Sequence, residues 1–194
     1  MKLILASNNN HKLIEIKAIL GGMFEEILSM REAGIDHETI EDGSTFMENA
    51  EKKAREIAEI SGCCALADDS GICVDALDGA PGIYSARFSG VHGDDKANNR
   101  LLLEKLAGCE NRGAHYTCAI ALVKPDGSIL RAEGYLYGQI GYEEIGTNGF
   151  GYDPLFVLPE RGCTAAQLSP EEKNRISHRA NALHELLALL QAEE

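Results

Sequence analysis

The chain has 194 residues, a length that suits one domain of ordinary size or two small lobes that share a core. Hydrophobic residues make up 44% and charged residues 25%, a globular composition that excludes intrinsic disorder for most of the chain. The net charge of −13 argues against binding to nucleic acid or to an anionic membrane. A small anion could bind only where local cations or a metal reverse that sign.

The six cysteines form no C-x-x-C pair, and none is spaced from a histidine as in a zinc finger. We interpret them as reduced thiols, which favours the cytoplasm. No targeting segment is recognisable, because the apolar run 3–6 is too short for a signal peptide. The apolar run 118–123 is far shorter than the ~20 residues that a membrane helix needs.

Short apolar runs in the first half of the chain predict strands at 2–6, 24–28 and 63–67. Between them, apolar residues at helical spacing predict two helices, one that ends at Gly21-Gly22 and one that runs from Thr45 to about Ser61. The second helix opens with the capping box Thr45-x-x-Glu48. We expect the third strand to stop abruptly at Asp68.

The second half predicts a long structured loop at 75–93, a helix at 94–106 and a hairpin at 115–136. A glycine-rich loop or bulged strand at 138–154, a short strand at 155–158 and a closing helix at 176–190 follow. The hairpin turn is Pro125-Asp126-Gly127, and the closing helix has Ser177 near its start. A hairpin excludes a wholly parallel sheet. The sequence therefore predicts one α/β domain over 1–194, with a mixed central sheet flanked by helices.

A polar turn, Ser7-Asn8-Asn9-Asn10-His11-Lys12, leads from the first strand into the first helix. Such a turn presents free backbone N–H groups and the positive end of the helix dipole, which together favour an anion. Lys12 stands in the first helical turn, where a positive charge is unfavourable, so a bound anion is the functional interpretation. The alternative is an Asn-rich turn with a solvated lysine.

Two carboxylates, Asp68 and Asp69, follow the third apolar run, at the carboxyl end of an expected strand, where open α/β sheets bind ligands. Because adjacent carboxylates repel each other, a divalent cation is their natural partner. Oxygen ligands with phosphate nearby favour Mg²⁺. The alternative is an acidic turn, since Asp-Ser-Gly is common turn chemistry.

The helix that begins at Thr45 has an apolar stripe formed by Phe46, Ala50, Ile57 and Ile60. Asn49 and Lys53 fall inside this stripe, so Lys53 either extends past the core edge to solvent or points into a polar cleft. Glu41, just upstream, could reach the same cleft as a metal ligand or remain a surface charge.

Two further segments suit a flat ligand or an anion. In Gly149-Phe150-Gly151-Tyr152-Asp153-Pro154, the glycines allow close backbone approach and Phe150 offers a stacking face, whereas the alternative is a tight bulge with a core Phe. Near Lys173, the helix start Ser177-His178-Arg179 opposes the dipole preference for acids and suits an anion or a purine edge, or is a solvated basic turn. Together, the segments describe a metal-assisted nucleotide phosphate site.

These segments also carry a family resemblance that runs nearly end to end. The chain resembles the inosine/xanthosine triphosphate pyrophosphatases, the Ham1-like house-cleaning enzymes, in Ser7-x-Asn9-x-x-Lys12, Thr45-Phe46-x-Glu48-Asn49-Ala50-x-x-Lys53-Ala54, Ala67-Asp68-Asp69-Ser70-Gly71, Gly79-Ala80-Pro81-Gly82-x-Tyr84-Ser85-Ala86-Arg87, Gly149-Phe150-Gly151-Tyr152-Asp153-Pro154 and Ser177-His178-Arg179. Several such blocks in the right order are highly specific, although one alone is not.

The resemblance implies a Mg²⁺-dependent enzyme that cleaves (d)ITP and XTP to the monophosphate and pyrophosphate. It also implies a cytoplasmic homodimer with an elongated α/β fold and a cleft between two lobes. By resemblance, Asp69 is the proton acceptor and a metal ligand, and Asp68 and Glu41 support the metal. The phosphates are held by Ser7, Asn9, Lys12, Lys53 and Ser70. The base and sugar are bound by Phe150, Gly151, Tyr152, Asp153, Lys173, His178 and Arg179.

One departure from the family pattern concerns the phosphate turn, where many members have Gly at the positions of Asn8 and His11. Asn tolerates left-handed backbone, so the turn can persist. His11 either adds a phosphate contact or crowds the turn.

Two other function classes remain open, a nucleotide sensor without turnover and a phosphohydrolase that acts on monophosphates. Release of pyrophosphate from ITP distinguishes the first, and IMP rather than inosine as product distinguishes the second.

Overall fold

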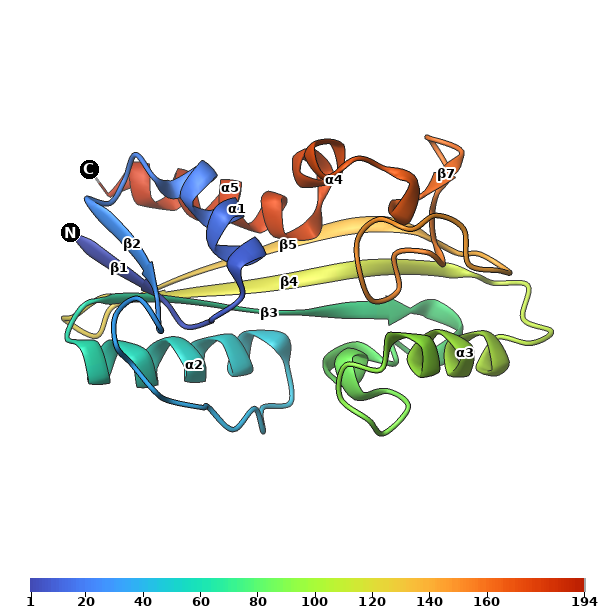
Figure 1. Ribbon diagram of the computed structural model, residues 1–194, viewed down its shortest axis with the longest axis horizontal. Helices are drawn as coiled ribbons and strands as arrows, with labels where there is room; N and C mark the ends of the chain where they lie inside the picture. Colours follow the sequence, from blue (N-terminus) through green and yellow to red (C-terminus); the bar gives the residue numbers. More distant parts are fainter. Residues whose placement is uncertain (194) are drawn as a thin grey trace. The chain divides into compact units, whose positions relative to one another are not determined.

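The fold is built on one seven-stranded sheet with the order β2-β1-β3-β4-β5-β6-β7, seen in a computed structural model that describes residues 1–193 and, for His11, the backbone only (Figure 1). The strands are β1 (Lys2–Leu5), β2 (Glu26–Ser29), β3 (Cys64–Val74), β4 (Gly113–Val123), β5 (Ile129–Ile140), β6 (Phe156–Leu158) and β7 (Cys163–Thr164). Strand β1 pairs in parallel with β2 and β3, whereas β6 pairs antiparallel with β5 and β7. The predicted mixed sheet is confirmed.

The helices connect and flank these strands. They are α1 (Asn10–Leu20), α2 (Phe46–Ser61), α3 (Asp95–Lys105), α4 (Pro170–Ile176) and α5 (His178–Ala192), with short 3₁₀ turns η1 (Asp75–Leu77), η2 (Gly82–Arg87) and η3 (Ala165–Gln167). Within the described part of the chain, no helix is both long and apolar enough to cross a membrane.

The chain divides into two compact units. Unit 1 comprises Met1–Asp69, Cys118–Gly134 and Arg179–Glu194, and unit 2 comprises Ser70–Thr117 and Tyr135–His178. Each unit has its own apolar core, and the core of unit 2 is built from β3, β4, β6 and α3 residues such as Ile72, Tyr116, Phe156 and Leu102. The cleft between two lobes stays a prediction.

In unit 1, successive strand residues pack against different helices. Leu3 and Leu5 of β1 share a core with α1 and α5, whereas Ile4 between them shares a core with α2. Figure 1 shows α1 and α5 on one side of these strands and α2 on the other. Strand β3 alternates in the same way, with Leu66 on the α1 and α5 side and Ala67 on the α2 side. This is the period of two that a pleated strand imposes.

Three expectations about the elements are wrong. Strand β3 does not stop at Ala67 but continues to Val74, because its polar middle is held by side chains of neighbouring helices. The closing helix is one helix, α5, but it begins at His178 and not at Ile176, because Ser177 is extended (φ −63°, ψ 152°) and separates it from α4, a short helix that was not predicted. Ile60 is 52% exposed, so the buried stripe of α2 is Asn49, Ala50, Ala54, Ile57 and Ala58.

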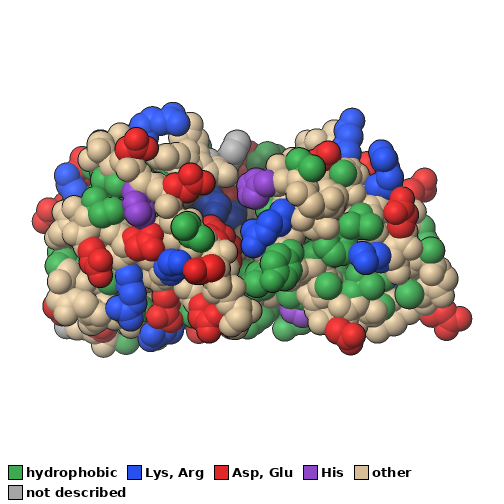
Figure 2. Space-filling model, turned by 90° about the horizontal axis from the view of Figure 1, so that it is seen from below, with side chains coloured by type: hydrophobic (Ala, Val, Ile, Leu, Met, Phe, Trp, Pro, Cys, Tyr) green, Lys and Arg blue, Asp and Glu red, His purple; other side chains and the backbone are tan. Residues whose placement is uncertain are grey.

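The outer face of α2 is charged rather than apolar. Figure 2 shows acidic and basic side chains interspersed over this part of the surface. The Lys52 ammonium lies 2.6 Å from Asp42, and Arg131 donates to both carboxylate oxygens of Glu51 at 2.5 and 3.0 Å. Helix α2 therefore presents a solvated ionic face outward and its buried stripe, including one amide, to the sheet.

Candidate functional site

The side chain of Asp69 lies against one face of α2. The Asn49 side-chain amide, which is buried, donates to Asp69 Oδ2 at 3.0 Å and accepts from the Gly43 N–H at 2.8 Å. One turn later, Lys53 Nζ lies 2.9 Å from Glu41 Oε1 and 3.8 Å from Asp69 Oδ1. The i, i+4 spacing places the two α2 side chains on the same face. The Lys53 side chain therefore points toward the carboxylates of Glu41 and Asp69 and does not pack in the apolar core.

Burial is the largest influence on Asp69. It raises the pKa of this carboxyl above its usual value, while Lys53 and the Asn49 amide pull it down without cancelling the effect. Nearby Glu41 and Asp68 add to the rise. A carboxylate with a raised pKa accepts a proton more readily near neutral pH, which is the property of a general base.

Asp68 has a separate set of partners on the α1 and α5 side. Lys12 Nζ lies 2.9 Å from its Oδ1, and Arg179 Nε lies 3.2 Å from its Oδ2. Arg179 also contacts Glu15 at 3.1 Å. Burial alone would raise the pKa of Asp68, but Lys12 and Arg179 outweigh it and hold the pKa well below its usual range. Asp68 is therefore ionised and each of its oxygens faces a cation.

The polar turn before α1 places its groups around the helix start. The Asn9 N–H donates to Ser7 Oγ at 3.1 Å, and Asn9 Oδ1 accepts from the Lys12 N–H at 3.3 Å. Asn8 is turned elsewhere, because its Oδ1 accepts from the Arg31 N–H at 2.9 Å. The predicted role of the His11 side chain lies outside the described residues. The turn thus brings Ser7, Asn9 and Lys12 together at the N-terminus of α1.

In unit 2, Asp153 is a buried centre of hydrogen bonds. Its Oδ2 accepts from the Phe150 N–H at 2.9 Å and from the Lys173 ammonium, and its Oδ1 accepts from the Tyr116 hydroxyl at 3.3 Å. Gly149 has φ +75°, and a Cβ there would lie 2.1 Å from Asp153 Oδ2. This position therefore requires glycine, as the sequence motif suggested.

Phe150 is 64% exposed, so the alternative of a core Phe is wrong. The Lys173 ammonium lies 4.8 Å from the centroid of its ring. His178 is buried and stacks on Tyr116, with ring centroids 4.9 Å apart and planes 13° apart. The aromatic ring of Phe150 is thus free to meet a ligand while its backbone is fixed.

These groups surround a cavity of about 140 Å³. Its lining includes every sequence-predicted site residue of unit 2, namely Ser70, Phe150, Gly151, Tyr152, Asp153, Lys173 and His178. Ser85, Asp95 and Tyr116 line it too, and apart from the family block that contains Ser85 no sequence pattern marks them as site residues. A small apolar cavity with a few polar groups is the usual form of a ligand site.

The predicted residues thus fall into two sets. Unit 1 contains Ser7, Asn9, Lys12, Glu41, Lys53, Asp68, Asp69 and Arg179, and unit 2 contains the rest. The adjacent residues His178 and Arg179 belong to different sets, and Arg179 binds carboxylates in unit 1. Asn49 is the residue that sequence reasoning noticed inside the α2 stripe without giving it a role.

The donor set around Asp69 fits a cation held with the help of substrate oxygens. Among residues 1–193, no three His, Cys, Asp or Glu side chains gather into a metal cage. Asp69 and Glu41 nevertheless share one cation, the Lys53 ammonium. Mg²⁺ is commonly bound by one or two carboxylates together with phosphate oxygens. The residues present suit that mode.

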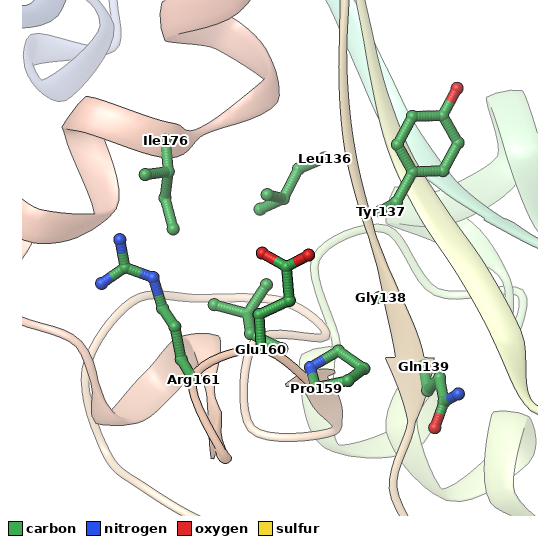
Figure 3. Close-up of a pocket in the computed structure, with 9 residues that line it drawn as sticks. Leu136, Tyr137, Gly138, Gln139, Pro159, Glu160, Arg161 and Ile176 are labelled. Carbon is green, nitrogen blue, oxygen red and sulfur yellow. The ribbon is translucent and has the colours of Figure 1, made fainter.

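A second, larger cavity of about 460 Å³ lies beside β5 and contains none of the predicted residues (Figure 3). Figure 3 shows Glu160 and Arg161 extending from the turn after β6 toward Leu136 and Ile176. Both charged side chains belong to exposed residues, and no buried polar group converges on the cavity from the residues that line it. It is a weaker candidate than the cavity at Phe150.

Comparisons with known proteins agree on one family. The family model described as the Ham1 family matches residues 3–189. A dITP/XTP pyrophosphatase of Exiguobacterium sibiricum is 52% identical over 192 residues, covering 98% of this chain and 97% of that protein. Its counterpart in Clostridium perfringens is 50% identical over 193 residues, with 95% of each covered. The structure of the Staphylococcus aureus Ham1 protein superposes with a TM-score of 0.93 at 40% identity, covering 100% of both chains.

Proposed function

The chain belongs to the Ham1 family, and from this premise we propose that it hydrolyses non-standard purine nucleoside triphosphates, dITP or ITP and XTP. The products are the monophosphate and pyrophosphate, and the reaction removes deaminated purines from the nucleotide pool. The observation that carries the proposal is Asp69, a partly buried carboxylate of raised pKa beside Lys53, Asn49 and Glu41.

Asp69 acts as the proton acceptor in this proposal. It orients the attacking water and takes its proton as the bond between the α and β phosphates breaks, so that the water oxygen ends on phosphorus and pyrophosphate leaves. The Asn49 amide fixes the orientation of the Asp69 carboxylate at 3.0 Å. Lys53 and Lys12, with Ser7, Asn9 and Ser70, bind phosphate oxygens and stabilise the charge that develops on the leaving group.

The cofactor that we propose is Mg²⁺, held by Asp69 and Glu41. When bound, it neutralises triphosphate charge and lowers the pKa of water. The Lys53 ammonium lies 2.9 Å from Glu41 and 3.8 Å from Asp69, which supports the proposal because it indicates that these two carboxylates favour a positive charge beside them. Asp68 supports this site less directly, because its own oxygens accept from Lys12 and Arg179.

The cavity of unit 2 is the proposed site for base and sugar. Phe150 stacks on the purine, while Gly151, Tyr152, Asp153, Lys173 and His178 complete the walls. Inosine and xanthosine carry a carbonyl at position 6, which a donor that lines the cavity, such as His178 or Lys173, can recognise. Adenosine carries an amino group there, and a site built for an acceptor rejects it by several powers of ten.

We also propose a homodimer in the cytoplasm. The family resemblance supports both statements, and the six cysteines, all of them free thiols, suit a reducing compartment. Equilibrium sedimentation tests the dimer, and a monomer at micromolar concentration would contradict it.

A panel of triphosphates with Mg²⁺ tests the function. We expect pyrophosphate release from ITP, dITP and XTP at least ~100-fold faster than from ATP, because adenine lacks the carbonyl at position 6 that the site recognises. Binding without turnover would indicate a sensor. Inosine and phosphate as products from IMP would indicate a different phosphohydrolase.

A further inference from the structure

Helix α3 holds both backbone polar groups of Gly151. In the first turn of the helix, Asp95 Oδ2 accepts from the Gly151 N–H at 2.8 Å. One turn later, Asn99 Nδ2 donates to the Gly151 carbonyl at 3.2 Å. Side chains four residues apart lie on the same face of a helix, so one face of α3 binds a single residue of the 149–153 loop at two points.

The side chains of Asp95 and Asn99 differ in exposure, although both reach the backbone of Gly151. Asn99 is 3% exposed, and its amide nitrogen also donates to Glu144 Oε1 at 2.7 Å. Since an amide nitrogen has two hydrogens, both are used and the orientation of the amide is fixed. Asp95 is exposed and lines the cavity. A buried, fully engaged donor and an acidic acceptor thus hold Gly151 from the same helix.

Gly151 joins two residues that shape the cavity. It has φ +61°, in the left-handed region, and it lies between Phe150 and Tyr152, which both line the cavity. Asp153 fixes the Phe150 N–H from within the loop. Without the two contacts from α3, the backbone of Gly151 would lose its side-chain anchors, and the neighbouring exposed Phe150 ring would have more freedom.

The same helix reaches another wall of the cavity. Asn98, 1% exposed, accepts from the Ser89 N–H at 2.8 Å and donates to the Ala86 carbonyl at 3.4 Å. Ala86 and Ser85 line the cavity, and the Tyr152 hydroxyl donates to the Ser85 carbonyl at 2.8 Å. Consecutive asparagines of α3 are therefore tied to two different wall segments, residues 85–89 and residue 151.

We propose that α3 is the platform that sets the shape of the base-binding cavity, with Asp95 and Asn99 as positioning residues that act through Gly151. The proposal rests on the proposed function, because it assigns these residues to recognition of the base. They act before the ligand arrives: a preformed loop spares the ligand the entropy of ordering it. Binding of phosphate groups in unit 1 does not depend on them.

The test compares IMP with inorganic pyrophosphate as ligands of the purified protein. We expect Asp95→Ala and Asn99→Ala each to weaken IMP binding by about tenfold, the effect of roughly one lost hydrogen bond. Pyrophosphate binding should stay within about twofold, and KM for ITP should rise more than kcat falls. Asp95→Asn keeps an acceptor oxygen and should restore most of the IMP affinity. Arg100→Ala, an exposed neighbour on α3, is the control.

Two outcomes would overturn the proposal. One is unchanged IMP affinity in both alanine variants, and the other is an equal loss of IMP and pyrophosphate binding, which would indicate a general structural defect. Amide hydrogen exchange over 149–153 tests the contacts of Asp95 and Asn99 with Gly151 without any nucleotide. The exchange should speed up in both alanine variants but not in Arg100→Ala. If the wild-type protein fails to bind IMP while amide exchange over 149–153 speeds up in both alanine variants, the proposed function is wrong, but the positioning of Gly151 by Asp95 and Asn99 is supported. Because Asp95 is exposed, Asp95→Ala should fold, and it keeps the proposal testable if Asn99→Ala does not fold.

Discussion

Asp68 and Asp69 are neighbours in β3, yet their carboxylates serve opposite faces of the sheet. Asp68 faces Lys12 of α1 and Arg179 of α5, and Asp69 faces Asn49 and Lys53 of α2. The pleat of the strand causes the division, because successive side chains alternate. The pKa of Asp68 is lowered by its two cations, whereas burial raises that of Asp69. Two adjacent carboxylates can thus have different roles, one as a permanent anion and one as a proton acceptor.

Asp69→Asn is expected to remove turnover without unfolding the protein. The amide keeps the size of the side chain but cannot accept a proton, so kcat for ITP should fall at least ~100-fold, the contribution of a general base. Because burial disfavours the charge of Asp69, the variant should melt no lower than wild type at pH 7. Pyrophosphate release and thermal melting measure the two effects. Turnover within about tenfold of wild type would mean that another group is the base.

Lys53→Met separates a binding role of this lysine from a packing role. The methionine fills similar space but leaves Glu41 and Asp69 without their shared cation, so we expect a folded protein with at least ~10-fold weaker triphosphate binding, as for a lost charged contact. Calorimetric titration with a nonhydrolysable ITP analogue gives the affinity. Unchanged affinity together with a lower melting temperature would instead assign Lys53 to packing.

The sequence predicted the sheet class and most of the strands and helices, and the reason is physical. Apolar runs, the Thr45 helix start and the hairpin turn are local signals, and local geometry decides them. The extent of β3 is different. Asp68, Asp69 and Ser70 read locally as a turn, but side chains of α1, α2 and α5 hold the polar residues in extended conformation. Tertiary contacts overrode the local preference.

The same limit explains what was missed around the candidate site. Tyr116 and Asp95 stand in a plain strand and in an ordinary helix start, so nothing in their neighbours along the chain marks them. Tyr116 is marked only by its hydrogen bond to Asp153, 37 residues away along the chain, and Asp95 by its hydrogen bond to Gly151, 56 residues away. Helix α4 was equally invisible, because Pro170–Ile176 is short and mostly charged or polar and shows no apolar repeat.

Asp68 should make the stability of the protein depend on pH in acid. Its folded pKa lies well below the unfolded value of about 3.9, so its stabilising contribution is complete above about pH 4 and is lost as the pH falls through the folded pKa. At pH 7, Asp68→Asn should lower the free energy of unfolding by about 3 kcal/mol, the lower end for a broken buried ion pair, because the buried Arg179 keeps Glu15 but loses its second carboxylate and Lys12 loses its ion pair. The difference in free energy of unfolding between variant and wild type should start to narrow at about pH 4 and narrow further as the pH falls toward the folded pKa of Asp68.

Urea denaturation at several pH values measures this difference. A gap that stays constant down to pH 3 would mean that the Asp68 carboxyl is not depressed in the folded state. Lys2→Met, which removes a surface pair with Glu26 at 2.9 Å, is the control and should change stability by less than about 1 kcal/mol.

Glu41 and Asp42 are adjacent acids that allow a matched test of the metal proposal. Glu41 contacts Lys53 beside Asp69, whereas Asp42 contacts Lys52 on the outer face of α2. We expect Glu41→Gln to weaken Mg²⁺ binding about tenfold, as for loss of one group that supports a metal, and Asp42→Asn to leave it unchanged. Manganese binding followed by electron spin resonance, with pyrophosphate present, reads the affinity apart from turnover. Equal weakening in both variants would reduce Glu41 to a general contribution of negative charge, and no weakening in either would leave Asp69 as the carboxylate that alone anchors the cation.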